Sequence, residues 1–263
     1  MPVLARRANP FGEIRIVSNR RTGAISYVQG SWYQSRADRF GVSLMGYIHA
    51  IFGLLVGLDA RRIALIGGAG GTLGSMLARI GREVTIVDID PHAFKAARAH
   101  FGLDESVTCR IADGRRYLAR TRARFDAIVV DAYWRGTAPA HLCTAEFFAL
   151  ARRRLARGGA ILFNAIAGSD SDPHPDRIAE SMMAAGLPAR ILDTLGETHR
   201  NAIIVGTRAN LKRPRLLMRP AVMAGDLAED LEAMVLRAPR PCDPILDADA
   251  QPKMRRVTAR GSR

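Results

Sequence analysis

Residues 62–90 read RIALIGGAGGTLGSMLARIGREVTIVDID, and this stretch decides the fold. Arg62–Gly67 is an apolar run that predicts a buried strand, Thr72–Ile80 has helical spacing, and Glu83–Asp88 predicts a second strand. The four glycines at positions 67, 68, 70 and 71 let the backbone pass close to a ligand, and the helix after them offers free N–H groups. We favour a ligand-binding loop here over a tight turn without a ligand.

The alternation of strands and helices continues toward the C-terminus. Helices are predicted at 91–101, 114–121, 144–155 and 175–185, and strands at 106–111, 125–131, 159–165, 189–193 and 202–207. Such alternation is typical of a parallel sheet with right-handed crossovers. The last two strands leave no room for a helix between them, so they should form an antiparallel pair at the sheet edge. We therefore predict an α/β fold with a seven-stranded, mostly parallel, doubly wound sheet.

Less regular structure is expected at both ends. Residues 1–12 resemble a loose arm, and residues 13–18 and 24–29 alternate apolar and polar side chains around a turn, which predicts a β-hairpin. Within 226–237 one more helix is expected, and from residue 238 a tail rich in Pro, Arg and Asp should fray. The predicted units are the arm and hairpin (1–40), the α/β domain (41–208), and a C-terminal helix with a flexible basic tail (209–263).

The composition narrows the class of protein. Hydrophobic residues make up 48% and charged residues 24% of the 263 residues, a globular balance. Val42–Leu58 is apolar but lies at the short limit for a membrane span and carries three glycines and a histidine, so we predict a buried helix. No CxxC pair occurs among the three cysteines, which argues against a zinc ribbon, an iron–sulfur cluster or a disulfide scaffold. The cysteine spacing therefore leads us to expect no metal. Because the N-terminus has no apolar signal region, we expect a cytoplasmic protein.

The net charge of +14 raises the question of a nucleic-acid partner. Lys occurs at only three positions, so nearly all of the 39 basic residues are Arg, as genome base composition often produces. A nucleic-acid partner is therefore disfavoured, although not excluded.

Acidic residues follow three of the predicted strands. Asp88 ends the second strand, where a carboxylate can accept hydrogen bonds from both ribose hydroxyls of a nucleoside. Asp113 follows the third strand, where it can accept from an exocyclic amine, cap the next helix, or do both. Asp131 ends the fourth strand, at the sheet edge where ligands of open α/β folds bind. Asp90 is interpreted as a helix cap because Pro91 follows it. Together with the glycine loop, these acids predict a site for an adenosine with free ribose hydroxyls.

The order of these motifs resembles the S-adenosylmethionine-dependent methyltransferase fold and, more closely, the spermidine synthase family of polyamine aminopropyltransferases. The resemblance covers residues 14–207 and includes the hairpin, the glycine loop, the Asp-Ile-Asp, Ala-Asp-Gly and Val-Val-Asp motifs, and the segments Thr144–Phe148 and Arg157–Leu162. It implies transfer of an aminopropyl group from decarboxylated S-adenosylmethionine to an amine such as putrescine, and a homodimer formed through the N-terminal region.

The resemblance also implies roles for individual residues. Asp131 would be catalytic, accepting a proton from the attacking amine or positioning it. Independently of the resemblance, the aromatic rings of Tyr133 and Trp134 could contact the amine substrate through cation–π interactions, or could only pack. The donor would be bound by the glycine loop, the acidic motifs and a glutamine after the hairpin, namely Gln34, Gly67, Gly68, Gly70, Asp88, Ile89, Asp113 and Gly114.

Three departures affect the amine half of the site. Gly70 stands where the family commonly has an acid, Trp134 stands in place of a second acid after Asp131, and no Tyr-Gln pair occurs around residues 44–47. Two alternatives therefore stay open. One is an S-adenosylmethionine-dependent methyltransferase with an unknown acceptor, and the other is a non-catalytic relative that binds a nucleoside.

Overall fold

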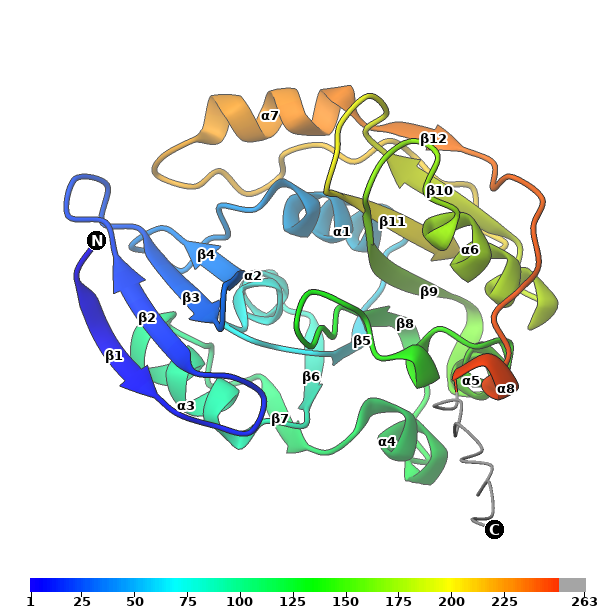
Figure 1. The fold of residues 1–263 in the computed structure, drawn as a ribbon, viewed down its shortest axis with the longest axis horizontal. Coiled ribbons are helices and arrows are strands. Elements are labelled where there is room, and N and C mark those ends of the chain that lie inside the picture. The colour runs from blue at the N-terminus through cyan, green and yellow to red at the C-terminus, as the bar shows by residue number, and fades with distance from the viewer. Residues whose placement is uncertain (251–263) are drawn as a thin grey trace, which may run out of the picture.

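The computed structural model describes residues 1–250 and contains two β-sheets (Figure 1). The larger sheet has eight strands in the order β12-β10-β11-β9-β8-β5-β6-β7. Its strands are β5 (Arg62–Ile66), β6 (Glu83–Asp88), β7 (Thr108–Ile111), β8 (Phe125–Val130), β9 (Leu155–Ala167), β10 (Ala189–Asp193), β11 (Arg200–Gly206) and β12 (Val235–Arg237). The five strands β9, β8, β5, β6 and β7, which are consecutive in the sheet, run parallel to one another. β11 runs antiparallel to both β9 and β10. The mostly parallel α/β sheet predicted from the sequence is confirmed.

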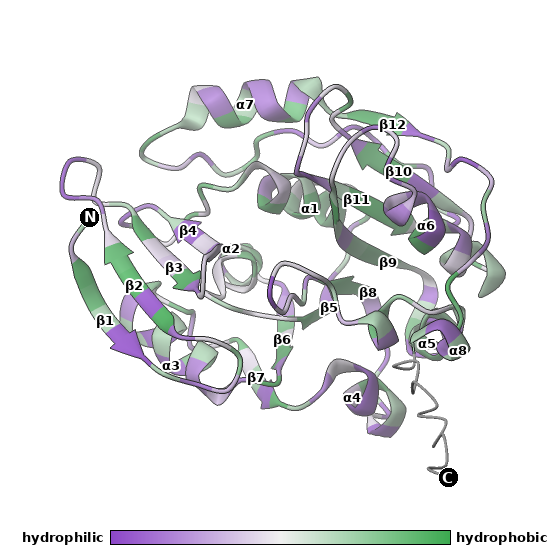
Figure 2. Ribbon diagram, viewed as in Figure 1, coloured by the Kyte–Doolittle hydropathy of each residue, from purple (hydrophilic) through white to green (hydrophobic). Residues whose placement is uncertain are grey.

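Helices cover both faces of this sheet. One face carries α1 (Gly46–Gly57), α2 (Thr72–Arg79), α3 (Pro91–His100) and α7 (Ala224–Ala233), and the other carries α4 (Gly114–Arg120), α5 (Ala145–Arg152) and α6 (His174–Ala184). Alternate residues of each strand enter the two hydrophobic cores, as Leu65 and Ile66 of β5 do. Figure 2 shows that the central strands are largely hydrophobic, whereas α7 alternates between hydrophilic and hydrophobic residues. Nine residues of α1 are buried, so the apolar segment 42–58 is a core helix.

The smaller sheet corrects the sequence prediction at the N-terminus. Four antiparallel strands, β1 (Val3–Arg7), β2 (Ile14–Ser18), β3 (Ile25–Gln29) and β4 (Trp32–Ala37), are paired in sequence order. The predicted hairpin is therefore β2–β3, and the expected loose arm contains the edge strand β1. Arginines and side chains exposed on both faces of β1 hide the alternation that marks a half-buried strand.

The C-terminal part also differs from the expectation. The predicted helix ends at Ala233, and residues 235–237 form β12, the eighth strand, so the count of seven strands was wrong. Arg237 of this strand is bound by the carboxylates of Asp176 and Asp193, a long-range reason for the strand that local spacing cannot reveal.

Residues 238–250 do not fray in the described structure. Ile245 is buried, and α8 (Asp247–Ala250) follows it. Arg115 donates two hydrogen bonds of 2.6 Å to the carboxylate of Asp247. The rest of the expected flexible tail, residues 251–263, lies outside the described residues.

None of the helices in residues 1–250 is both long enough and apolar enough to cross a membrane. The expected cytoplasmic location and the expected division into three units stay predictions.

Candidate active site

Two adjoining cavities open at the carboxyl ends of β5, β6 and β8. The larger cavity has a volume of about 680 Å³ and the smaller cavity about 120 Å³. Six residues line both, namely Gln34, Gly67, Gly68, Ala69, Asp131 and Tyr133. The structure therefore brings most of the predicted site residues together at one edge of the sheet, where open α/β folds bind their ligands.

The glycine loop between β5 and α2 is held close to the end of β8. Gly67 has φ +91°, and a Cβ atom there would lie 2.2 Å from the carbonyl oxygen of Asp131, so only glycine fits. The N–H of Gly68 donates to Asp88 Oδ2 at 2.8 Å. This bond ties the loop to the end of β6 and sets the floor of both cavities.

Gly70 lies on the far side of this loop and lines neither cavity. Its N–H donates to Ser35 Oγ at 3.0 Å, and a Cβ atom there would come within 3.0 Å of both Ser35 and Phe101. The structure thus does not bring Gly70 to the donor site that the resemblance implied, because the N-terminal sheet packs against it.

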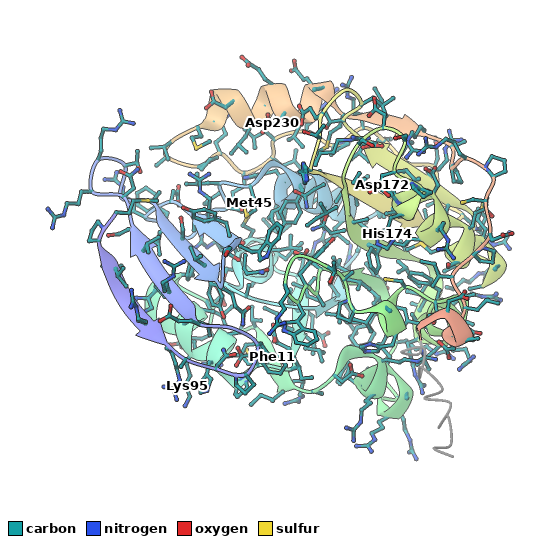
Figure 3. The ribbon with its side chains drawn as sticks, viewed as in Figure 1. Phe11, Met45, Lys95, Asp172, His174 and Asp230 are labelled. Carbon is teal, nitrogen blue, oxygen red and sulfur yellow. The ribbon has the colours of Figure 1, made fainter. Side chains whose placement is uncertain are left out.

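The larger cavity contains the acidic motifs after β6 and β7. Asp88, Ile89, Asp113 and Gly114 line it, together with Phe11 from the β1–β2 loop, which is labelled in Figure 3. Burial raises the pKa of Asp88, while the backbone N–H groups of Asp90 and Gly68 oppose that shift. Its two carboxylate oxygens accept from the N–H groups of Asp90 and Gly68, and the residue lines the larger cavity.

Asp113 has two partners at the rim of the larger cavity. Its Oδ1 accepts from the N–H of Arg116 at 2.9 Å, so it caps α4 as one reading of the sequence proposed. Its Oδ2 lies 2.8 Å from His141 Nε2. His141 lies in the 3-10 helix Ala140–Leu142 between β8 and α5, and no motif in the sequence marks this lone histidine. Asp90 caps α3, as expected.

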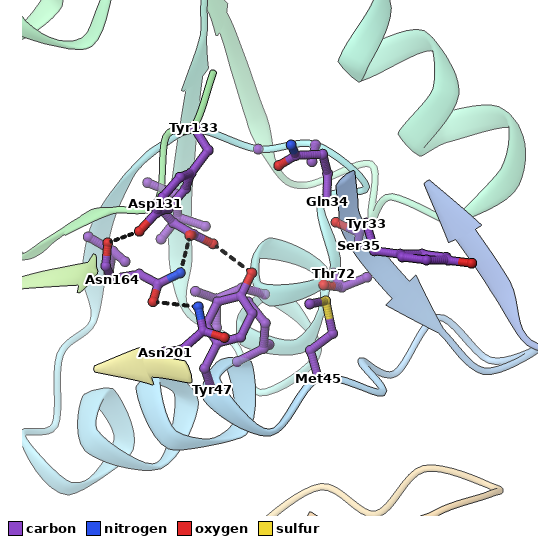
Figure 4. A pocket seen from close by; sticks show the side chains of 18 of the residues that line it. Tyr33, Gln34, Ser35, Met45, Tyr47, Thr72, Asp131, Tyr133, Asn164 and Asn201 are labelled. Carbon is purple, nitrogen blue, oxygen red and sulfur yellow. Dashed lines mark hydrogen bonds between the residues drawn. The ribbon is translucent and has the colours of Figure 1, made fainter. Parts of the chain in front are cut away.

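Asp131 stands between the two cavities and is held from both sides (Figure 4). Tyr47 donates its hydroxyl to Oδ2 at 3.2 Å, and the Asn164 amide donates to Oδ1 at 2.8 Å. Burial raises the pKa of Asp131, and these two hydrogen bonds lower it in part. The result is a fixed carboxylate that binds a proton more readily than an exposed aspartate does.

A second set of contacts orients the groups that hold Asp131. Asn201 donates from its amide to Asn164 Oδ1 at 2.9 Å, which leaves the Asn164 amide nitrogen to point at Asp131. Tyr133 donates its hydroxyl to the Asn164 carbonyl oxygen at 2.7 Å. Burial raises the pKa of both the Tyr47 and the Tyr133 hydroxyl, so each remains a proton donor.

Sequence reasoning missed Tyr47, Asn164 and Asn201. A usable signal existed for Asn164, because it interrupts the apolar strand GAILFNA and a buried amide needs partners. Tyr47 stands in the sequence without the glutamine of a Tyr-Gln pair, so no motif marks it. Asn201 meets Asn164 across β9 and β11, a pairing that the sequence alone does not specify.

Trp134 lines the larger cavity but not the smaller cavity that contains Tyr47 and Asn164. Its side chain is half exposed, and the guanidinium of Arg135 lies 5.2 Å from its ring centroid. A cation of this chain therefore already occupies one face of the ring.

The charge of the lining contrasts with that of the chain. The chain has 39 Lys and Arg residues, yet none of them is among the described residues that line the two cavities. Four carboxylates do line them, those of Asp88, Asp90, Asp113 and Asp131. The site therefore suits a ligand that carries positive charge. Within residues 1–250, no three His, Cys, Asp or Glu side chains gather as a group that could hold a metal ion.

This topology defines an α/β fold of the S-adenosylmethionine-dependent methyltransferase type. Residues 47–169, slightly less than half of the chain, match the spermine/spermidine synthase domain. The chain is also similar over its length to the structure of a probable spermidine synthase from Corynebacterium glutamicum, with 18% identity, a TM-score of 0.74, and coverage of 91% of this chain and 92% of that one.

Two curated relatives carry different names. A polyamine aminopropyltransferase of Vibrio vulnificus is 28% identical over 64% of this chain and 58% of its own length. An N-terminal histidine N-methyltransferase of Emericella nidulans is 30% identical over 62% of this chain and 33% of its own length. The chain thus spans between one third and three fifths of the length of these relatives.

Proposed function

We propose that the chain is a transferase that moves the aminopropyl group of decarboxylated S-adenosylmethionine to an amine. The observation that carries the proposal is the charge of the site, where a strongly basic protein presents carboxylates and no Lys or Arg among the described lining residues. Decarboxylated S-adenosylmethionine carries a sulfonium and an ammonium but no carboxylate, so it matches this lining. The match of residues 47–169 to the spermine/spermidine synthase domain supports the same reaction.

The adenosine would occupy the larger cavity. In this arrangement Asp88 accepts hydrogen bonds from the two ribose hydroxyls, Ile89 and Gly114 pack beside the nucleoside, and Gly67 and Gly68 allow its close approach. Asp113 would accept from the adenine amine, which requires it to share or release its contact with His141. Gln34 lines both cavities and would contact the aminopropyl part.

The reaction would be a direct displacement at the junction of the cavities. The lone pair of the acceptor nitrogen forms a bond to the carbon next to sulfur, while the carbon–sulfur bond breaks and its electrons stay on sulfur. The products are methylthioadenosine and a lengthened, protonated amine, whose proton passes to the Asp131 carboxylate. Because the sulfonium is already a good leaving group, the protein contributes orientation and a neutral nucleophile. A buried carboxylate with a raised pKa suits the second task.

A methyltransferase on the same fold is the second candidate, and the relative named as a histidine N-methyltransferase favours it. Its donor, S-adenosylmethionine, carries a carboxylate, which would find no Lys or Arg among the described residues that line the cavities. The deciding experiment offers the purified protein each donor with a panel of amines and identifies the nucleoside product by mass. Methylthioadenosine with a lengthened amine supports aminopropyl transfer, whereas S-adenosylhomocysteine would replace the proposal by methyl transfer.

A homodimer through the N-terminal sheet remains part of the proposal. β1 pairs with β2 on one side only, and its Val3 and Leu4 side chains are about half exposed. Such an edge can pair with the same edge of a second copy. Light scattering that returns the mass of one 28.7 kDa chain would contradict this proposal.

A further inference from the structure

The smaller cavity holds little negative charge for a site that is to bind amines. Asp131 is the one charged side chain among its described lining residues. The other polar lining groups are amides and hydroxyls, namely those of Tyr33, Gln34, Ser35, Tyr47, Thr72, Tyr133, Asn164 and Asn201. All of these are neutral at physiological pH, so they solvate a cation without compensating its charge.

The reaction with a diamine brings three cationic centres to this region. The donor contributes its sulfonium and its terminal ammonium, and the acceptor contributes the ammonium at the end that does not react. Burying an ammonium without a counter-charge is costly. A single carboxylate that is also needed at the reacting nitrogen cannot compensate all three.

The positions that could supply a second carboxylate do not do so. Trp134 faces only the larger cavity and stacks with Arg135, and Gly70 is turned toward Ser35 and Phe101. Ile166, which pairs with Asn201 across β9 and β11, lines the smaller cavity with an apolar side chain.

Two acids do line a third cavity next to this one. Glu197 and Asp230 face a space of about 290 Å³ that shares Met45, Tyr47 and Asn201 with the smaller cavity. Arg36 and Arg200 line the same space, and Arg200 is bound there by the carboxylates of Asp193 and Asp170. Neither acid is among the described residues that line the smaller cavity, so neither places a carboxylate inside it.

We infer that the acceptor is a primary monoamine, with one amino group on a small uncharged body, and not a diamine such as putrescine. The inference rests on the proposed function for the identity of the reaction, but the preference for one positive charge over two is a property of the cavity. It can therefore be measured by binding as well as by turnover.

The turnover experiment compares two acceptors of equal length, butylamine and putrescine, which differ only in the second amino group. With decarboxylated S-adenosylmethionine as donor, kcat/KM for butylamine should exceed that for putrescine by about tenfold or more, the ratio that 1.4 kcal/mol produces. Equal use of both amines, or a preference for putrescine or a longer polyamine, would overturn the inference.

A charge added to the cavity provides the matched test. Ile166→Glu places a carboxylate on the wall beside Asn201, and Ile166→Gln places a neutral group of the same shape there. The Glu variant should shift the ratio of putrescine to butylamine use by about tenfold toward putrescine, and the Gln variant should not. The same shift in both variants would contradict the role of charge.

The binding experiment separates this inference from the proposed function. Butylamine and putrescine are titrated by calorimetry into wild-type protein saturated with methylthioadenosine. Tighter binding of butylamine supports the inference even if no aminopropyl transfer is found, in which case only the proposed function fails. Tighter binding of putrescine, or binding of neither amine, overturns the inference whatever the protein catalyses.

Discussion

Asp131 is the side chain on which the proposed chemistry depends, because it joins the two cavities and is the charged group at the smaller one. Asp131→Asn keeps its size and removes its ability to accept a proton. We expect the rate of methylthioadenosine release to fall about 100-fold or more, with nearly unchanged affinity for methylthioadenosine. A variant with full activity would show that Asp131 is not the proton acceptor.

The pH dependence of the reaction should follow the ionisation of Asp131. The carboxylate must be deprotonated to accept a proton, so activity rises with pH through its pKa, which burial raises above the ordinary value. Tyr47→Phe removes a hydrogen bond that lowers this pKa, so the acidic limb of kcat/KM should move to higher pH. Tyr133→Phe is the control, because the Tyr133 hydroxyl donates to a carbonyl and not to Asp131. A limb that stays in place, or moves to lower pH, in Tyr47→Phe would refute this assignment.

The same raised pKa has a consequence for stability. A carboxyl group whose pKa is higher in the folded than in the unfolded chain stabilises the fold at low pH, and this contribution is lost as pH rises through the folded-state pKa. The asparagine side chain of the Asp131→Asn variant does not titrate. The Tm of this variant minus that of the wild type should therefore increase from acidic to neutral pH. Thermal unfolding at a series of pH values measures the difference. A constant or decreasing difference would be incompatible with a destabilising Asp131 charge.

At the scale of elements, the glycine loop shows what the sequence could predict. The strand, glycine and helix pattern of residues 62–90 predicted the loop and its neighbours to within a residue or two. The sequence could not say which glycine faces the ligand site, because that depends on the N-terminal sheet. Ser35 of β4 binds Gly70 and so separates it from Gly67 and Gly68.

The close approach of the loop to the end of β8 makes Gly67 intolerant of substitution. Gly67→Ala should lower the free energy of unfolding by at least about 2 kcal/mol more than Gly81→Ala. Both glycines have positive φ, so backbone strain is common to the two variants, but a Cβ at Gly81 meets nothing within 4 Å. Denaturant unfolding measures both variants. Equal losses of unfolding free energy in the two variants would mean that the structure relieves the contact between the new Cβ atom and the Asp131 backbone at little cost.

The strands that escaped prediction share a physical cause. β1 and β12 lie at sheet edges and lack the alternation or apolar runs that mark interior strands, and β12 has only three residues. Their partners, β2 and β10, supply the hydrogen bonds that define them. Local sequence predicts elements that bury their own side chains and fails for those that depend on a distant neighbour.

At the scale of the whole molecule, the segment before residue 250 closes back on the mouth of the larger cavity. Asp247 accepts hydrogen bonds from Arg115 and from Thr144 Oγ1 at 2.7 Å, and Arg115 also donates to the carbonyl of His141 at 3.2 Å. These contacts tie the rim residue His141 to the C-terminal segment. Nothing in the sequence around residue 247 predicts them, since the partners lie more than a hundred residues away.

Asp247→Asn should therefore weaken nucleoside binding without touching the cavity. We expect about fivefold weaker affinity for methylthioadenosine, because loss of the charged pair loosens the rim. Asp243→Asn is the matched control, an exposed acid in the same segment whose carboxylate has no hydrogen bond among the described residues. Calorimetry measures both variants, and equal affinities would show that the rim holds its position without this contact.

The contact between Arg115 and Asp247 also affects the order in which parts of the molecule fold during translation. Arg115 and Asp247 are 132 residues apart, so a ribosome adding 5–20 residues per second needs on the order of ten seconds between them. By the end of that interval Asp88, Asp113 and Asp131 and the strands before them have been synthesised, while the contact of Asp247 with Arg115 has not yet formed. A nascent chain should therefore acquire its sheet first and its full affinity for a nucleoside only when the segment carrying Asp247 has left the ribosome.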